Sequence, residues 1–386
     1  MTSDSRSVQS QSQKTNLKLE TWNSKLETHN LKLFPTHITL NNRPTRVDEL
    51  IAGRENATGW ERDWLDFLAE WYDARDYIEV KTSGSTGEPK NILLKKDFVA
   101  ASALRTIRFF NLKAGDRVLH CLPARYIAGK LMIVRALIGQ LDLHLVDPAT
   151  DFEVLQSGLH FKFAAMVINQ VSKILEFGIW NLKFDRRNLD FLLLGGSAIP
   201  VSLEEKLQQV QTTCYSSYAM TETATHIALR QLNGPGKDGW YHGLDGISVK
   251  LNENGCVRIE MPGLENGFLQ TNDLGELKDE RTFRILGRAD NRIISGGLKF
   301  SPEELEGKLE SAIDLPFYIS SKPDERLGAR LVLVVEGTES AGLISQLRES
   351  CNERLSRYEQ PGEIIFTPAL PRTGNGKIKR LPPDQL

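Results

Sequence analysis

Short apolar runs alternate with amphipathic stretches along the first 230 residues of the chain. Four of these runs have the length of buried strands and lie at 118–123, 141–146, 163–168 and 189–194. Helical spacing appears between them, as in 97–110, where one stripe carries Ala100, Leu104, Ile107 and Phe110. This alternation predicts an α/β fold with a largely parallel sheet.

Beyond residue 234 the pattern changes to short strands broken by glycine and asparagine, at 249–261, 267–277 and 282–288. They predict a β-rich appendage to the first domain. Residues after 290 contain a further strand at 329–337 and a helix at 340–355, which predicts a small α+β domain. We therefore expect a large domain over 31–289 and a small C-terminal domain over 290–386.

Three helix starts carry capping signals. Asp97 precedes the apolar stripe of 97–110, and Ser202 with Glu205 has the spacing of a capping box. Ser301 is followed by Pro302, the residue type favoured at the first helical position.

The first 30 residues are predicted to be a disordered lead-in. Five serines and three glutamines fall within the first 13 residues, and no apolar segment typical of a signal peptide is present. No run approaches the ~18 apolar residues of a membrane span. The four cysteines lie far apart without a CxxC pair, which indicates reduced thiols rather than a zinc site. We expect a cytoplasmic protein.

The charge balance excludes one class of partner. The chain has 48 lysines and arginines against 50 aspartates and glutamates, which gives a net charge of −2. Nucleic-acid binders usually show a basic excess or patch, so we expect no nucleic-acid partner.

Residues 82–90, TSGSTGEPK, are the strongest local signal in the chain. Two glycines allow the backbone to approach an anion closely, and four hydroxyls can donate hydrogen bonds to phosphate oxygens. The segment lacks the G-x-x-x-x-G-K-[ST] pattern of a Walker A loop. A flexible linker would rarely follow a strand directly and end in Pro-Lys, so we interpret 82–90 as a phosphate-binding loop.

Five segments in order resemble the motifs of the adenylate-forming superfamily, which includes acyl- and aryl-CoA ligases, peptide-synthetase adenylation domains and luciferases. They cover 82–90, 218–223 (YAMTET), 271–274 (TNDL), 287–297 (GRADNRIISGG) and 370–377 (LPRTGNGK). Two positions depart from the superfamily pattern, because Ala219 and Asn272 stand where glycine is usual. The resemblance implies that ATP activates a carboxylate as an acyl-adenylate, releasing pyrophosphate, before the acyl group passes to a thiol.

The resemblance also implies roles for individual residues. Lys377 would bridge the carboxylate and the α-phosphate, Thr221 would donate to the α-phosphate, and Glu222 would ligate Mg²⁺. Other residues would bind ATP and AMP: Thr82, Ser83, Gly84, Ser85, Thr86, Gly87 and Lys90 at the phosphates, Gly195, Gly196 and Ser197 at adenine, and Tyr218, Asp273 and Arg288 around the nucleoside. Asp290 would be the hinge of a domain rotation that presents Gly296 and Gly297 to coenzyme A, the co-substrate.

The short N-terminal half and the segments 122–137 (LPARYIAGKLMIVRAL) and 221–230 (TETATHIALR) resemble the o-succinylbenzoate–CoA ligase branch. That acid is an aromatic keto diacid of menaquinone synthesis, so a cation should hold its non-reacting carboxylate. The candidates are Arg125, Lys130, Arg135 and His226. We expect Arg125 to be the main anchor, because it follows a strand end where α/β folds gather ligands, with His226 as a neighbouring donor. Arg135, on an expected helix, is interpreted as a surface cation.

Two alternatives stay open from the sequence. One is another acyl- or aryl-CoA ligase, or a free-standing enzyme that adenylates amino acids. The other is a catalytically inactive nucleotide-binding homologue, against which the joint presence of Glu222, Asp273 and Lys377 argues. A homo-oligomer is possible on either reading.

Overall fold

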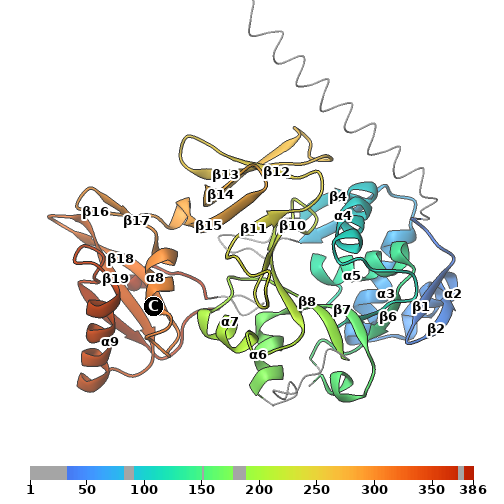
Figure 1. The fold of residues 1–386 in the computed structure, drawn as a ribbon, viewed down its shortest axis with the longest axis horizontal. Coiled ribbons are helices and arrows are strands. Elements are labelled where there is room, and N and C mark those ends of the chain that lie inside the picture. Colours follow the sequence, from blue (N-terminus) through green and yellow to red (C-terminus); the bar gives the residue numbers. More distant parts are fainter. Residues whose placement is uncertain (1–32, 82–90, 150–151, 177–187, 373–377) are drawn as a thin grey trace, which may run out of the picture.

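The computed structural model describes residues 33–81, 91–149, 152–176, 188–372 and 378–386 (Figure 1). The expected lead-in, the phosphate-binding loop at 82–90 and Lys377 lie outside these residues. Among the helices that the structure describes, none is long and apolar enough to cross a membrane.

A mixed sheet forms the centre of the large domain (Figure 1). Its parallel part consists of six neighbouring strands, which are β1 (His37–Leu40), β6 (Asp142–Leu145), β5 (Arg117–His120), β7 (Phe161–Val167), β8 (Leu189–Gly195) and β9 (Thr213–Ala219). β2 (Arg43–Arg46) closes one edge antiparallel to β1. The four apolar runs of the sequence all lie on or directly after strands of this parallel part, as predicted.

The expected β-rich appendage continues the same sheet rather than forming a separate one. Beyond β9 the pairing becomes antiparallel through β10 (His226–Gln231), β11 (Tyr241–Gly243), β15 (Thr282–Arg288), β14 (Phe268–Leu277), β13 (Cys256–Glu260) and β12 (Ser248–Leu251). The prediction of a largely parallel sheet is therefore confirmed for about half of the strands in this sheet. Antiparallel neighbours can be joined by short turns, which explains the frequent glycines and asparagines after residue 234.

Two apolar cores cover the two faces of the parallel strands. One core contains buried side chains of α3 (Gly59–Tyr72), α4 (Lys96–Phe109) and α5 (Ile127–Gly139), and the other contains those of α6 (Ile168–Glu176) and α7 (Val201–Leu207). Strand periodicity divides β8 between them, because Leu193 faces the first core while Leu192 and Leu194 face the second. Helix α5 is buried along nearly its whole length.

A two-stranded hairpin and three short helices complete the large domain. The hairpin of β3 (Tyr77–Lys81) and β4 (Asn91–Lys95) brackets residues 82–90, and α2 (Val47–Gly53) with the single-turn helices η1 (Arg54–Asn56) and η2 (Glu153–Gln156) fills connections. The strand predicted before the phosphate-binding loop is therefore present.

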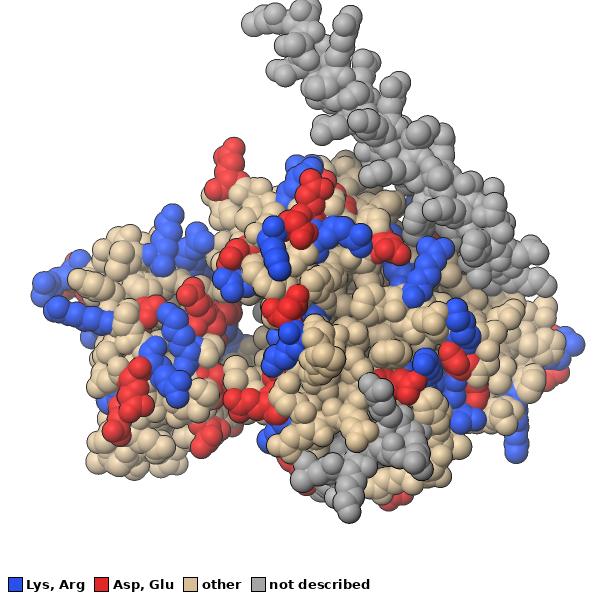
Figure 2. Space-filling view, in the orientation of Figure 1, with Lys and Arg blue, Asp and Glu red and all other residues tan. Residues whose placement is uncertain are grey.

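The C-terminal residues form a smaller unit with its own apolar core, drawn at the left of Figure 1. It contains β16 (Ile293–Ser295), β17 (Leu298–Phe300), α8 (Pro302–Leu309), β18 (Phe317–Asp324), β19 (Gly328–Glu336), α9 (Ala341–Arg354), β20 (Glu363–Thr367) and the final turn η4 (Pro383–Gln385). A single helical turn, η3 (Ala289–Asn291), connects it to β15. Figure 2 shows a hollow between this unit and the large domain, and basic and acidic side chains mixed over the face that it draws.

The capping predictions had mixed outcomes. Helix α8 starts after Ser301 with Pro302 in the first turn, as predicted, but the Ser301 hydroxyl donates to Leu286 O and makes no cap hydrogen bond. The capping box at Ser202 was wrong, because α7 already begins at Val201 after Pro200. Helix α4 likewise begins at Lys96, one residue before the expected cap Asp97. In both helices the chain is already helical at the proposed cap, so its side chain cannot serve the N-terminus as an N-cap.

Candidate active site

The carboxyl ends of β8 and β9 meet at one edge of the sheet, because these two strands are parallel neighbours. Strand β8 ends at Gly195, where an added Cβ would lie only 2.9 Å from Ser217 Oγ. Gly196 follows with φ +100°, a conformation that favours glycine. The segment expected to receive adenine therefore has the close backbone approach that such a platform requires, while its role remains a prediction.

The turn after β9 carries the residues expected at the α-phosphate and the metal. The hydroxyl of Thr223 stabilises this turn, because its oxygen lies within hydrogen-bond distance of two carbonyls, Met220 O at 3.0 Å and Thr225 O at 2.8 Å. Ala224 adopts φ +62°, and its N–H donates to Thr221 O at 3.0 Å. Glu222 is exposed at the tip of the turn. The segment presents this carboxylate outward on a rigid support.

The exposed carboxylate of Glu222 is open to a metal ion that would also contact phosphates. No group of three or more His, Cys, Asp or Glu side chains that could hold a metal occurs within the described ranges. Magnesium is commonly held by one or two carboxylates together with substrate phosphates and water, so a single open carboxylate fits it.

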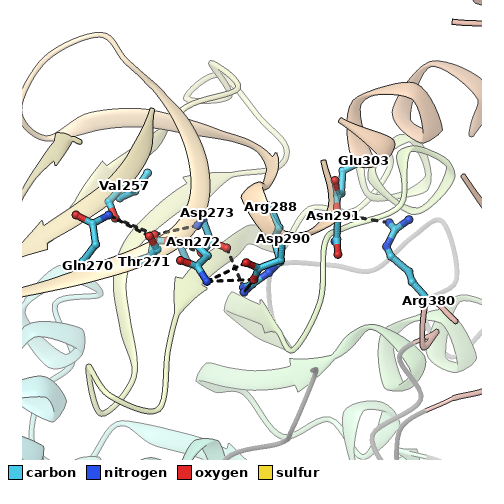
Figure 3. Close-up of polar contacts among 11 residues, drawn as sticks. Val257, Gln270, Thr271, Asn272, Asp273, Arg288, Asp290, Asn291, Glu303 and Arg380 are labelled. Atoms are coloured by element: carbon cyan, nitrogen blue, oxygen red, sulfur yellow. Dashed lines mark hydrogen bonds and ion pairs between the residues drawn. The ribbon is translucent and has the colours of Figure 1, made fainter. Parts of the chain in front are cut away.

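Asp273 lies at the centre of a buried polar network that joins three strands (Figure 3). It is placed opposite Arg288 in the register of β14 and β15, and Arg288 Nη1 donates to its Oδ1 at 3.1 Å. Tyr218 of β9 donates its hydroxyl to Asp273 Oδ2 at 2.6 Å. Burial, together with the neighbouring carboxylate, raises the pKa of Tyr218, so the phenol remains a donor. Three residues predicted separately around the nucleoside therefore lie together.

The described residues on either side of 373–377, the range that contains Lys377, are held in place. Arg372 and Ile378 form an antiparallel bridge on either side of 373–377, and Lys379 N donates to Pro371 O at 2.7 Å. Arg380 forms a two-pronged ion pair with Glu306 of α8. The residues that flank the loop are therefore anchored to the core of the small domain.

Two of the expected acid-binding cations have other surroundings in the structure. Arg125 is exposed, with its guanidinium 5.3 Å from the ring centre of Tyr126. Lys130 is buried and donates to Glu70 Oε2 at 2.6 Å and to Glu79 O at 3.0 Å. Lys130 thereby fixes α5 to α3 and to β3, the strand that leads into 82–90. The charge of Lys130 is already neutralised by Glu70. We therefore do not propose Lys130 as a ligand of the acid substrate.

The expectation that Arg135 is a surface cation was wrong. Its side chain is 2% exposed in the middle of α5, and its Nε has no hydrogen-bond partner in the described part of the chain. Arg135 Nη2 lies 3.5 Å from Thr225 Oγ1, in the turn that carries Glu222. The sequence signal for this burial was the position of Arg135 within the apolar run LMIVRALIG, because a helix that is apolar on all sides is buried.

His226 lies beside Arg135, and the segment that joins it to Glu222 is not helical. Residues 222–225 form a turn, and His226 begins strand β10. Its Nε2 lies 3.2 Å from Thr106 Oγ1 and its Nδ1 3.3 Å from Thr225 Oγ1. Burial first, and then the charges of Arg135 and Arg105, hold the pKa of His226 well below its usual range. His226 is therefore a neutral donor or acceptor next to a buried cation.

Two buried histidines should make the protein acid-sensitive. Burial lowers the pKa of His120 to about 4, and His226 is shifted in the same direction. The unfolded chain binds protons below pH ~6.5 while the native histidines do not, so stability present at pH 7 is lost as the pH falls. For His120 the loss between pH 7 and pH 5 is about 2 kcal/mol.

We expect His120→Gln to reduce the difference in unfolding free energy between pH 7 and pH 5 by that amount, measured by urea titration. His37→Gln, which changes an exposed histidine of β1, is the control. An unchanged pH dependence in His120→Gln would contradict the assignment of a neutral native histidine.

These features are those expected of an enzyme that handles a nucleotide at the carboxyl edge of a mixed α/β sheet. The chain belongs to the AMP-binding enzyme family, whose model matches residues 44–252, and residues 318–377 match the AMP-binding enzyme C-terminal domain.

Among its relatives, a 2-succinylbenzoate–CoA ligase of Listeria monocytogenes serotype 4b (strain F2365) is 26% identical over 364 residues, which covers 86% of this chain and 75% of the relative. An acyl-CoA synthetase (AMP-forming)/AMP-acid ligase II-like protein from Dyadobacter fermentans is 34% identical, with a TM-score of 0.56, and the match covers 85% of this chain and 95% of that structure. The O-succinylbenzoate coenzyme A synthetase from Bacillus subtilis, solved with ATP and magnesium, shares the fold at 22% identity and a TM-score of 0.66, covering 87% of this chain and 81% of that structure.

Proposed function

We propose that this protein is an AMP-forming acid–thiol ligase that joins o-succinylbenzoate to coenzyme A through an acyl-adenylate, a step of menaquinone synthesis. Membership of the AMP-binding enzyme family and several 2-succinylbenzoate–CoA ligases among the relatives support this reaction. The observation that carries the substrate assignment is Arg135, a buried cation beside the turn of Thr221 and Glu222.

The ribose of the nucleotide would bind at Asp273, between Tyr218 and Arg288. Each carboxylate oxygen of Asp273 accepts one hydrogen bond from the protein and keeps a lone pair for a ribose hydroxyl. The platform at Gly195, Gly196 and Ser197 would receive adenine at the adjoining strand end. The phosphates would then extend toward the turn of Thr221 and toward residues 82–90.

Adenylation brings a carboxylate onto the already anionic α-phosphate, so the site must supply positive charge where negative charge accumulates. Lys377 would supply it from the small domain, and Thr221 would donate a hydrogen bond to the α-phosphate. A magnesium ion held by Glu222 would neutralise phosphate oxygens when bound. The exposed position of Glu222 leaves room for this coordination.

The acid would lie with its reacting carboxylate at the turn and its second carboxylate toward Arg135. The guanidinium offers a planar fork that matches a carboxylate through two parallel hydrogen bonds. His226, held neutral by its surroundings, would lie next to this pair as a polar neighbour. This arrangement replaces Arg125, whose side chain lies exposed against Tyr126, as the proposed main anchor.

Coenzyme A would approach the turn between β16 and β17 after the small domain has rotated. Gly296 and Gly297 adopt φ +57° and +81°, and an added Cβ at Gly297 would meet no atom within 4 Å. An added Cβ at Gly296 would instead lie 3.2 Å from Leu327 Cδ2, so the backbone is open at Gly297, where a narrow pantetheine arm could lie.

The proposed function is tested by separating the two half-reactions. Incubation with ATP, Mg²⁺ and o-succinylbenzoate should release pyrophosphate in an amount close to that of the enzyme, and later addition of coenzyme A should give AMP and the thioester. Hydrolysis of ATP to ADP, or no pyrophosphate release with any acid, would contradict the assignment. Pyrophosphate release without thioester formation would instead favour a free-standing adenylating enzyme.

A further inference from the structure

The turn between the domains is held from two sides by neighbouring residues (Figure 3). Asp290 accepts a hydrogen bond from Arg288 Nη2 at 2.7 Å, and Asn272 Nδ2 lies 3.0 Å and 3.1 Å from its two carboxylate oxygens. The next residue, Asn291, donates its amide to Glu303 of α8. The side chain of Asp290 is thus held by the sheet of the large domain, and that of Asn291 by a helix of the small domain.

Asn272 stands where the superfamily pattern T-G-D-L has glycine. Glycine has no side chain, so it cannot make the contact with Asp290 that is seen here. Asn272 is exposed on β14, directly before Asp273, and its amide group contacts both oxygens of the hinge carboxylate. The departure from the pattern therefore adds a contact at the hinge.

We propose that Asn272 is a positioning residue of the hinge, which holds Asp290 on the large domain and so sets the balance between the two domain orientations. The inference rests on the proposed function, because the alternation of adenylation and thioester formation is what gives the hinge its role. Hinges absorb a rotation in a few backbone torsions. Because the side chains of Asp290 and Asn291 are held by different domains, we expect the rotation to occur in the backbone torsions between these two residues.

Arg288 contacts two carboxylates at once, which gives the second contact on Asp290, from Asn272, a function of its own. One guanidinium donates to Asp273, the expected ribose ligand, and to Asp290, the expected hinge. A guanidinium that turns toward a bound ribose would weaken its contact with Asp290. Asn272 keeps Asp290 in place independently of Arg288, so nucleotide binding does not by itself release the hinge.

The test uses Asn272→Ala, Asn272→Asp and the control Asn254→Ala, which changes an exposed asparagine in the turn between β12 and β13. The proposal predicts that Asn272→Ala moves the rates of the two half-reactions in opposite directions and changes their ratio by about 3- to 10-fold. Asn272→Asp should have the larger effect, because a second carboxylate would face Asp290. The affinity for AMP should change less than about 2-fold, since Asp273 and Arg288 remain.

A second measurement reads the domain orientation without any substrate. Spin labels on Glu253→Cys and Glu339→Cys, both exposed, report the distance between the domains, and the four native cysteines are buried. We expect Asn272→Ala to broaden or shift the distance distribution and Asn254→Ala to leave it unchanged.

The two readouts distinguish failure of this inference from failure of the proposed function. An unchanged distance distribution, or half-reactions that fall together by one factor, would overturn the role of Asn272. Distances that respond in a protein that adenylates no acid would support the hinge contact and overturn the proposed function instead.

Discussion

Lys377→Ala is expected to slow acyl-adenylate formation by about 100- to 1,000-fold, the range found when one group that stabilises transition-state charge is removed. Transfer of a supplied acyl-adenylate to coenzyme A should change much less, because that step no longer joins an anion to a phosphate. Pyrophosphate release and thioester formation from synthetic acyl-adenylate, measured separately, check this prediction.

Arg380 provides a comparison for the lysine variant. It anchors the residues after the loop to Glu306, so Arg380→Ala disturbs the small domain without removing the charge of Lys377. A damaged small domain should impair both half-reactions, since both depend on its position. If Lys377→Ala also reduced both half-reactions equally, the lysine would be structural and its proposed role in adenylation would be lost.

Arg135→Met should raise the KM for o-succinylbenzoate by about 10- to 150-fold, the range of a buried charge-assisted hydrogen bond, with little change in the KM for ATP. Methionine fills much of the same volume and leaves no buried charge behind. Replacing a buried ion by a well-packed apolar side chain is often neutral or stabilising, so the melting temperature should not fall. Steady-state kinetics with each substrate varied, together with thermal melting, measure both effects.

Arg125→Met is the matched comparison, because it makes the same change at the exposed arginine favoured by the sequence. An analogue of the acid that lacks the non-reacting carboxylate should bind weakly to the parent and respond little to Arg135→Met. A larger effect of Arg125→Met on the diacid would return the anchor to Arg125. Equal losses of Arg135→Met for both acids would make Arg135 a packing residue.

The sequence predicted well where a feature depends on local pattern. The parallel strands followed from short apolar runs, because a strand buried on both faces needs apolar residues on both. Tyr218, Asp273 and Arg288, which are expected around the nucleoside, come from separate motifs, and the structure brings them together through the pairing of β14 with β15 and a side chain from β9.

Features that depend on tertiary placement were not readable from spacing. The helix carrying Arg135 could be predicted, but its burial between β-strands and α-helices on all sides depends on how α5 packs. Glu222 and His226 have helical spacing in the sequence, yet a buried hydroxyl at Thr223 and the left-handed Ala224 make a turn there. Asn272 looked like the loss of a glycine, and only the fold shows that its amide reaches Asp290.

The central claim is the identity of the acid, and ATP–pyrophosphate exchange across a panel of acids tests it most directly. The panel should contain o-succinylbenzoate, the analogue without its second carboxylate, simple aryl and arylacetic monoacids, and amino acids. We expect the highest kcat/KM for o-succinylbenzoate, with a preference over the monoacids that disappears in Arg135→Met. Faster exchange with a monoacid or an amino acid than with o-succinylbenzoate would contradict it.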